Sequence, residues 1–316
     1  MKVLVTGGAG FIGSHLVEAL LKQGLDVSVI DDFNDFYDPL TKEKNLESVR
    51  SKITVHQVDI RNKKAVTDTV SIERPDTIVH LAARAGVRPS ILDPELYLET
   101  NVKGTFNLLE AAKNVAVGRF IFASSSSVYG ASTEIPFRED QTIVQTLSPY
   151  AATKLAGEHV CSNYSYLYGL RVVCLRFFTV YGPRQRPDLA IHKFTKLIDR
   201  GKPIDLYGDG TARRDFTYID DIIQGVLAAL EYDREPFDIF NLGESETIEM
   251  RQMISDLEAT LGRTATVNSL PAVRGDMPLT YADVSKARRL LGYTPKTRFR
   301  EGIRKFVEWY SGTQRK

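Results

Sequence analysis

The chain has 316 residues, of which 43% are hydrophobic and 26% charged, a composition typical of a soluble protein with a large core. Its 41 lysines and arginines nearly balance 40 aspartates and glutamates, which leaves no excess charge for binding nucleic acid or an anionic membrane. The first residues carry no leader pattern, and no apolar run approaches the roughly 20 residues that span a bilayer, so we expect a cytoplasmic protein.

The amino-terminal residues predict a strand, a glycine turn and a helix in direct succession. The β-branched run Lys2–Thr6 leads into Gly7–Gly13, and an apolar pattern of period 3.6 continues to Gln23. Gly7 permits a tight turn, Gly10 permits close approach of a pyrophosphate, and Gly13 permits close packing of the helix on the strand. The pyrophosphate is expected at the helix N-terminus, where N–H groups and the helix dipole favour anions.

An acidic residue at the end of the second strand indicates which dinucleotide binds. Asp31 ends the strand 26–31, eighteen positions after Gly13. A carboxylate there accepts hydrogen bonds from a ribose diol and repels a 2′-phosphate, so we predict NAD rather than NADP. The alternative is a glycine turn in another kind of α/β protein. The strand before the turn, the helix after it and the acid at this distance favour the dinucleotide site.

The next elements repeat the alternation of strand and helix. Strands are predicted at 53–57, 77–81, 119–123 and 171–176, and helices at 62–73, 94–114 and 148–168. This alternation predicts an α/β fold, a Rossmann-type doubly wound parallel sheet with ligands outside the carboxyl ends of its strands. Residues 32–52 form an insertion that is expected to be too polar for the core. At the carboxyl end of the third strand, Asp59 and Ile60 are expected near the adenine.

Beyond residue 181 the alternation becomes irregular, which predicts a smaller carboxyl-terminal α/β lobe. Short strands are expected at 204–206, 238–241 and 265–270, between helices at 190–200, 219–232 and 247–261. Because no linker marks a boundary, we expect an NAD-binding part at 1–180 and a nucleotide-sugar-binding lobe at 181–316 that is interleaved with it.

Cysteine and histidine usage argues against a disulfide and against a metal site. Cys161 and Cys174 both lie in apolar patterns and are expected to be buried without forming a disulfide. The five histidines show no ligand spacing with one another or with cysteine.

A tyrosine, a lysine and a serine run are the candidate catalytic groups. Tyr150 and Lys154 are four apart at the start of a helix, so their side chains leave from one face. A lysine ammonium favours phenolate and is expected to lower the tyrosine pKa toward that of a general base. Four serines follow the fifth strand, and Ser125 or Ser127 could share a proton with a substrate oxygen. Such a pair alone could be an exposed surface feature, but the serines and the dinucleotide loop favour catalysis.

Six motifs together resemble the extended short-chain dehydrogenase/reductases that act on nucleotide-sugars, and most closely the UDP-glucuronate 4-epimerases. The motifs are Gly7–Gly13, His80–Arg88, Ala123–Gly130, Ser148–Lys154, Arg176–Pro183 with Arg186–Asp188, and Arg214–Asp220. The first and fourth are general to the superfamily, whereas the second and fifth point to the uronate enzymes. The resemblance covers nearly the whole chain.

The resemblance implies C4 epimerisation, from UDP-glucuronate to UDP-galacturonate. Tyr150 takes the proton of the 4-hydroxyl while a hydride passes from C4 to bound NAD, and the 4-keto sugar turns over and receives the hydride on its other face. Lys154 holds the nicotinamide ribose, and Ser125 and Ser127 contact O4. NAD is regenerated in each cycle and is expected to be tightly bound. Related dehydratases and decarboxylases carry acidic residues where this chain has Ser126 and Ser127, which argues against elimination.

The predicted ligand residues form two sets. The cofactor set is Gly7, Gly10, Phe11, Ile12, Gly13, Asp31, Asp32, Asn34, Asp59, Ile60, Leu81, Ala82, Ala83, Arg84, Asn101, Ser124, Tyr150 and Lys154. The substrate set is Arg88, Ser125, Ser126, Ser127, Thr179, Arg186, Asp205, Tyr207, Arg214, Arg274 and Asp276. Within the substrate set, the resemblance implies that Arg186 binds the sugar carboxylate or the adjacent part of the substrate. It also implies that Arg214 and Arg274 bind the diphosphate, that Asp276 binds the ribose, and that the segment Asp205–Tyr207 binds the uracil. Arg186 could instead be a surface arginine in a loop.

Three functional alternatives remain beside the uronate epimerase. A 4-epimerase of a neutral UDP-hexose or UDP-N-acetylhexosamine would use the same catalytic groups. An NAD-binding sensor without catalysis is disfavoured because the tyrosine, lysine and serines are intact, and a nucleic-acid-binding module lacks a basic stripe. The resemblance also implies a homodimer that pairs the helices near 94–114 and 148–168, although packing against the core would explain their apolar stripes equally well.

Overall fold

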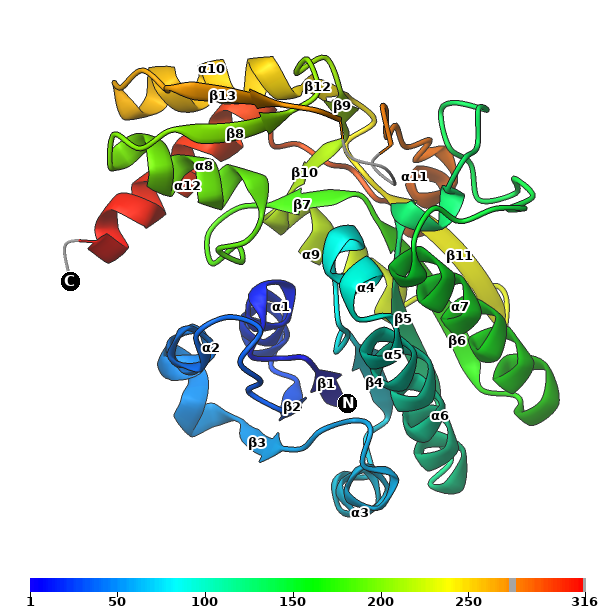
Figure 1. Cartoon of the computed structure of the whole chain (residues 1–316). Helices are drawn as coiled ribbons and strands as arrows, with labels where there is room; N and C mark the ends of the chain where they lie inside the picture. Colours follow the sequence, from blue (N-terminus) through cyan, green and yellow to red (C-terminus); the bar gives the residue numbers. More distant parts are fainter. Residues whose placement is uncertain (273–276, 315–316) are drawn as a thin grey trace.

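The computed structural model describes residues 1–272 and 277–314, and a seven-stranded parallel sheet forms its centre (Figure 1). The strand order is β11-β6-β5-β4-β1-β2-β3, and each neighbouring pair is parallel. The order reverses direction between β1 and β4, which is the feature of a doubly wound Rossmann-type sheet and confirms the predicted fold class. The strands are β1 (Lys2–Thr6), β2 (Asp26–Asp31), β3 (Thr54–Gln57), β4 (Thr77–His80), β5 (Arg119–Ser125), β6 (Arg171–Phe177) and β11 (Phe237–Leu242).

Both faces of the sheet are buried, and successive side chains of a strand enter different hydrophobic clusters. In β1, Val3 and Val5 belong to one cluster and Leu4 to the other. One face is covered by α1 (Phe11–Lys22) and α9 (Ile219–Leu230), and the other by α3 (Lys63–Glu73), α6 (Gly104–Asn114) and α7 (Pro149–Tyr168). This burial explains why the strands are nearly continuous apolar runs.

Two expected segments differ in detail. The helix predicted over 94–114 is divided into α5 (Pro94–Tyr97), a π-helical segment η2 (Leu98–Lys103) and α6. The insertion at 32–52 folds into α2 (Pro39–Leu46) and the short helix η1 (Glu47–Lys52). The prediction that this insertion stays out of the core was wrong, because Lys42, Leu46 and Val49 are all buried. An amphipathic helix buries one face even when its composition is polar.

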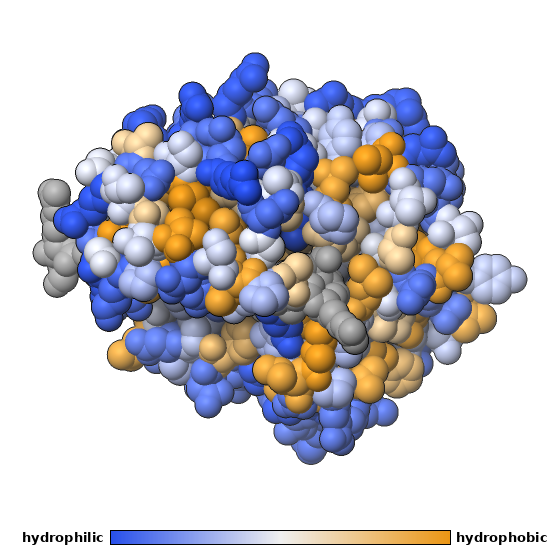
Figure 2. Space-filling model, turned by 45° about the horizontal axis from the view of Figure 1, so that its top comes forward, coloured by the Kyte–Doolittle hydropathy of each residue, from blue (hydrophilic) through white to orange (hydrophobic). Residues whose placement is uncertain are grey.

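The irregular carboxyl-terminal elements gather in a smaller lobe beside the sheet (Figure 1). It contains three two-stranded pairs, β10 with β7, β12 with β9 and β13 with β8. These elements are β7 (Thr179–Tyr181), α8 (Ala190–Asp199), β8 (Ile204–Tyr207), β9 (Arg213–Arg214), β10 (Phe216–Tyr218), β12 (Ile248–Glu249), α10 (Met250–Leu261), β13 (Val267–Leu270), α11 (Ser285–Leu291) and α12 (Phe299–Gln314). On the face in Figure 2, hydrophobic residues lie in separate groups between hydrophilic ones.

One strand assigned to the lobe from the sequence belongs to the central sheet. The strand expected at 238–241 is β11, which pairs in parallel with β6 from Phe237↔Val172 to Leu242↔Phe177. Assigning it to the lobe was wrong, because periodicity predicts a strand but not the distant strand with which it pairs. The chain therefore enters the lobe after β6 and returns through α9 to extend the sheet.

The structure also bears on the two cysteines and on whether any helix could span a membrane. Cys161 and Cys174 are buried and form no disulfide, as expected. Among the residues described, each helix is too short or too polar to cross a bilayer.

Candidate active site

The turn after β1 is shaped by glycines that no larger residue could replace without displacing the backbone. Gly7 has φ +70°, and a Cβ on it would lie 2.7 Å from the Ala82 nitrogen. A Cβ on Gly13 would lie 2.2 Å from the Gly7 oxygen. Gly10 caps α1 without a side-chain acceptor, so the first-turn amides face the cavity above the turn with no competing side chain. This geometry suits a diphosphate at a helix N-terminus.

A cavity of about 440 Å³ extends from this turn to the ends of β4 and β5 and to the lobe. Most of the predicted ligand residues line it together. They are Gly7, Gly10, Phe11, Ile12, Gly13, Asp31, Asp32, Asn34, Ile60, Leu81, Ala82, Ala83, Arg84, Ser124, Ser125, Ser126, Ser127, Tyr150, Lys154, Thr179 and Arg186. The cavity therefore joins the candidate cofactor residues and the candidate catalytic groups in one space.

Two predicted cofactor residues, Asn101 and Asp59, do not line the cavity. Asn101 is buried and bonds both the nitrogen and the oxygen of Arg84, at 2.8 and 2.9 Å, and the Thr153 hydroxyl at 3.0 Å. It therefore holds the backbone of the segment that lines the cavity. The Asp59 carboxylate accepts from the Arg61 guanidinium, beside the cavity-lining Ile60.

The remaining predicted substrate residues that the structure describes lie outside the cavity wall. The Arg88 guanidinium lies 4.1 Å from the centre of the Tyr207 ring, which brings α4 (Val87–Leu92) to β8 of the lobe. Asp205, also on β8, accepts from the Asn268 amide at 3.3 Å, and Arg214 on β9 donates to the Arg213 oxygen at 2.9 Å. Arg274 and Asp276 lie outside the described residues.

The acid that is expected to select the ribose is held by two backbone amides and a buried lysine. Asp31 accepts from the Ala9 and Phe33 nitrogens at 3.1 and 2.9 Å. Lys42 lies 3.4 Å from the same carboxylate and 3.7 Å from that of Asp32. Burial raises the pKa of Asp31, although the Lys42 charge and the amide donors oppose this. Lys42 lines the cavity, and the sequence analysis missed it.

Tyr150, Lys154 and the serines come together at the end of β5. The Ser125 hydroxyl contacts the Ser127 hydroxyl at 2.8 Å, and it lowers the pKa of the neighbouring Tyr150 phenol. The Lys154 ammonium donates to the Ala123 oxygen at 2.7 Å and lies 5.0 Å from the centre of the Phe122 ring. Tyr97, on α5, packs edge-on against the Tyr150 ring.

The expected effect of Lys154 on the tyrosine pKa is corrected by this geometry. Burial raises the pKa of Tyr150, and the groups that oppose the rise are the Ser125 hydroxyl and the Arg186 charge rather than Lys154. Burial also lowers the pKa of Lys154 to about 8. Sequence spacing places both groups on one helix face, but only the tertiary structure decides which charges reach the phenol.

Arg186 lies in the cavity wall rather than on the outer surface. Its guanidinium pairs with Asp188 at 2.9 and 2.8 Å, and it lies 5.3 Å from the centre of the Phe36 ring. Phe36 also lies 6.0 Å from the Arg84 guanidinium. The aromatic residues Phe36 and Tyr37 line the cavity and were missed from the sequence. Two aromatic rings within a polar insertion were the available signal, because such rings seek burial.

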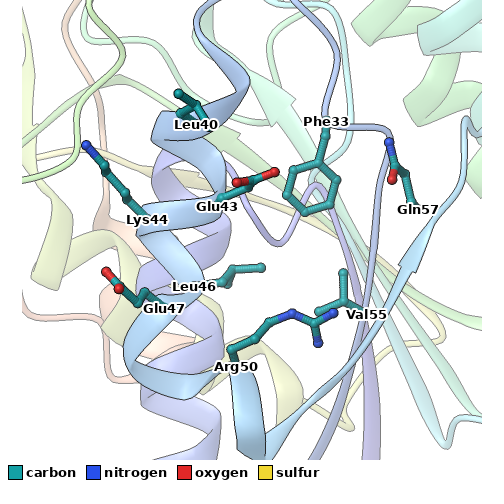
Figure 3. Close-up of a pocket in the computed structure, with 9 residues that line it drawn as sticks. All are labelled: Phe33, Leu40, Glu43, Lys44, Leu46, Glu47, Arg50, Val55 and Gln57. Atoms are coloured by element: carbon teal, nitrogen blue, oxygen red, sulfur yellow. The ribbon is translucent and has the colours of Figure 1, made fainter.

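A second hollow, of about 590 Å³, lies between α2–η1 and β3 (Figure 3). Glu43 points toward Phe33 at one end, and Arg50 reaches toward Val55 at the other. None of the predicted catalytic or glycine-turn residues lines this hollow. The chemistry therefore belongs to the cavity above the glycine turn.

Comparison with known proteins agrees with this site. The model of the NAD dependent epimerase/dehydratase family matches residues 3–243. The chain belongs to this family. A UDP-glucuronate 4-epimerase of Thermodesulfobacterium geofontis is 42% identical over 309 residues, which cover 97% of this chain and 95% of that protein.

Two solved structures of the family are also similar over nearly the whole length. A UDP-glucuronic acid 4-epimerase from Bacillus cereus, in complex with UDP-glucuronic acid and NAD, has a TM-score of 0.93 and 41% identity. The match covers 99% of this chain and 100% of that one. A UDP-glucose 4-epimerase of Thermus thermophilus, in complex with NAD, has a TM-score of 0.91 and 36% identity, with 99% of each chain covered.

The residues of this family member fit NAD. A Cβ on Gly7 or Gly13 would lie within 3 Å of backbone atoms, so no side chain fits at either position, and Gly7, Gly10 and Gly13 line the cavity. The carboxylates of Asp31 and Asp32 line the same cavity, Asp31 directly beside the glycine turn through its bond to the Ala9 nitrogen, and they suit a ribose diol.

Proposed function

We propose that this chain is an NAD-dependent UDP-glucuronate 4-epimerase, which interconverts UDP-glucuronate and UDP-galacturonate through a transient 4-keto sugar. The observation that carries the proposal is the meeting of Tyr150, Lys154 and Ser125 in one cavity with the glycine turn. The UDP-glucuronate 4-epimerases among its relatives support the uronate as substrate. Residues 1–180 are proposed to hold NAD, tightly and through repeated cycles, and residues 181–316 to hold the nucleotide-sugar.

The chain's residues move and hold protons at O4 of the sugar. NAD held by the glycine turn and Asp31 would supply the acceptor for the C4 hydride and its return to the opposite face of the ring. Tyr150 takes the O4 proton as general base and later returns it, while Ser125 hydrogen-bonds the same oxygen and Ser127 supports Ser125. Lys154 is proposed to hold the ribose of the cofactor.

The substrate carboxylate needs a fixed orientation, because a 4-keto uronate is a β-keto acid and loses carbon dioxide readily. Loss requires the carboxylate C–C bond to align with the π system of the ketone. We propose that Arg186 grips the carboxylate or the adjacent part of the substrate, while Thr179 and Ser126 hold it from the β7 and β5 sides. A guanidinium fork suits this task because it binds a carboxylate bidentately.

The nucleotide is proposed to lie along the lobe. Arg88 and Tyr207 stack where α4 meets β8, next to Asp205, which we propose contacts the uracil. Arg214 and Arg274 are proposed to bind the diphosphate, and Asp276 the ribose.

We further propose a homodimer that pairs α6 and α7 of two subunits. Phe106 on α6 is 43% exposed and packs edge-on against Tyr164 of α7. Leu167 and Tyr168, at the end of α7, are also exposed. Sedimentation equilibrium measures the state directly, and a monomer at micromolar concentration would remove this part of the proposal.

The experiment that tests the activity offers the protein several UDP-sugars and separates the products by chromatography. We expect conversion of UDP-glucuronate to UDP-galacturonate. Conversion of UDP-galactose but not of UDP-galacturonate would favour a 4-epimerase of neutral UDP-sugars. The similarity to a UDP-glucose 4-epimerase is the observation that supports this alternative.

The base is tested by Tyr150→Phe, which removes one hydroxyl from a half-buried ring. Turnover should fall by about 10³-fold or more, while the protein still retains NAD. NAD content after purification and product chromatography measure the two effects. Wild-type turnover in this variant would refute Tyr150 as the base.

A further inference from the structure

Helix α7 carries a third ionisable residue on the face that holds the candidate base. Tyr150, Lys154 and Glu158 follow one another at intervals of four, so their side chains leave α7 on the same side. The Glu158 side chain is only 3% exposed. It has no part in the proton transfers proposed above, and its charge is expensive to bury without a purpose or a partner.

Glu158 joins α7 to two strands of the sheet. The Arg176 guanidinium, on β6, binds it bidentately at 2.9 and 2.8 Å. The Ser124 hydroxyl, on β5, donates to it through a short hydrogen bond. Arg176 also lies 4.8 Å from the centre of the Tyr129 ring, whose hydroxyl donates to the Asn241 amide oxygen on β11 at 2.7 Å. The carboxylate is thus the junction of a buried polar network.

The serine bound by Glu158 lies between the two residues that contact the candidate catalytic pair. Ala123, on one side of Ser124, accepts from the Lys154 ammonium at 2.7 Å. Ser125, on the other side, lines the cavity together with Tyr150 and lowers the pKa of its phenol. Any shift of Ser124 along or out of β5 would therefore move both contacts together.

We propose that Glu158 is a positioning residue. Its carboxylate, oriented by Arg176, holds Ser124 in place and thereby fixes the end of β5 relative to Tyr150 and Lys154. The inference rests on the proposed function of this site. A buried ion pair is weak evidence for stability, because desolvation offsets the attraction, but it favours one geometry over others. Here that geometry is the distance between the strand end and the helix face.

The charge of Glu158 also acts on Lys154. The groups that raise the pKa of Lys154 against burial are Cys161 and Glu158 on α7 and Cys174 on β6. His80 on β4 faces the same ammonium and has a pKa lowered to about 3 by burial and by that charge. Removing the carboxylate therefore lowers the pKa of Lys154 further.

The first test is Glu158→Gln, which preserves shape and removes the charge. We expect kcat to fall about tenfold or more with the KM for UDP-glucuronate changed less than about twofold, because Glu158 does not reach the cavity. The basic limb of the pH–rate profile should move to lower pH. The matched control is Glu73→Gln, since Glu73 is another buried carboxylate that bridges two basic groups, Lys2 and His56, away from the cavity. An unchanged pH profile in Glu158→Gln would overturn the proposal.

Ser124→Ala supplies a second test that leaves the ion pair intact. Its effect on kcat should match that of Glu158→Gln in direction, and the double variant should be no worse than the poorer single variant. Additive losses, or a Ser124→Ala variant with wild-type kcat, would show that Glu158 does not act through the serine.

A readout without turnover separates this inference from the proposed function. Hydrogen exchange of the amides at 124–127 should be faster in Glu158→Gln and Ser124→Ala than in the wild type, and unchanged in Glu73→Gln. If the wild type converts no UDP-sugar, the proposed function fails while the exchange comparison still decides the inference. Equal exchange in all four proteins would overturn it.

Discussion

Burial favours the uncharged forms of both Tyr150 and Lys154 and shifts their pKa values accordingly. The pKa of the phenol rises, and that of the ammonium falls to about 8. Two charged or polar neighbours, Ser125 and Arg186, favour the phenolate and partly offset the rise. The groups that favour ionised tyrosine therefore come from β5 and from the lobe, and Lys154 on α7 is not one of them.

Arg186 offers a test of carboxylate recognition at the same scale. We expect Arg186→Lys to weaken binding of UDP-glucuronate about tenfold, because an ammonium keeps the charge near Tyr150 but loses the fork. Binding of UDP-glucose should change by less than about twofold. Titration calorimetry measures both.

The matched control is Arg263→Lys, whose exposed guanidinium pairs with Asp199 at 3.7 Å outside the cavity. Equal weakening of both sugars by Arg186→Lys would show that the arginine does not read the carboxylate.

At the scale of an element, α7 is defined by its two ends. Ser148 caps it by accepting from the Ala151 nitrogen at 3.2 Å, Pro149 follows at the first helical position, and Gly169 ends it at φ +69°. The first turn carries Tyr150, so the cap that starts the helix also orients the candidate base. Local sequence signals therefore bear directly on the site.

Removal of this cap should affect both stability and catalysis. Ser148→Ala is expected to cost about 1 kcal/mol of unfolding free energy and to lower kcat several-fold, because the first turn frays. Asn62→Ala removes the equivalent cap of α3, which accepts from the Ala65 nitrogen at 3.1 Å, and should cost stability alone. Urea unfolding and product chromatography measure the two effects. Equal kcat values in the two variants would contradict a link between this cap and Tyr150.

At the scale of the whole molecule, buried acids at the joint between sheet and lobe make stability depend on pH. Asp215 is fully buried and accepts from the Glu244, Ser245 and Ala282 nitrogens at 2.7 to 3.1 Å. Burial and the charges of Asp221 and Asp215 raise the pKa of Glu244 to about 8. The folded chain therefore retains a proton that the unfolded chain releases above about pH 4.5.

Because Glu244 holds its proton more firmly in the folded chain than in the unfolded chain, it lowers the free energy of unfolding as the pH rises toward 8. Three histidines make stability rise with pH at lower pH, because burial lowers their pKa in the folded chain. They are His15, His80 and His192. Their contribution is complete above their unfolded pKa of 6.5. Between pH 6.5 and about 8, Glu244 therefore controls how steeply the free energy of unfolding changes with pH.

Glu244→Gln, which cannot ionise, should flatten that slope. We expect the wild-type melting temperature to fall by about 2 °C or more between pH 6.5 and 8.5, and that of the variant to fall by less. Glu235→Gln, at an exposed position in the loop before β11, is the control and should follow the wild type. Calorimetry checks this, and a parallel fall in all three proteins would contradict the assignment.

Much of the architecture could be predicted because its signals are local. The run at 2–6, the glycines at 7–13 and the acid at 31 are each read from neighbouring residues, and the first strands and helices lie where they were expected. The predicted residues around Tyr150 also line one cavity, because parallel strands all end at the same edge of the sheet.

Other features could not be predicted, because they depend on contacts between distant segments. Strand β11 was recognised as a strand but not as the neighbour of β6, and Lys42 was assigned to a polar insertion although it is buried beside Asp31. The π-helical turn before α6 also escaped prediction.

The sequence by itself determined the first six strands of the sheet, the glycine turn and the pairing of Tyr150 with Lys154 on one helix face, since each follows from residue spacing and backbone geometry. Only the tertiary structure decided that Arg186 from the lobe reaches the cavity, that burial raises the tyrosine pKa, and that Glu158 joins α7 to β5 and β6. These depend on the dielectric surroundings and on which distant segments meet, and neither is encoded in local spacing.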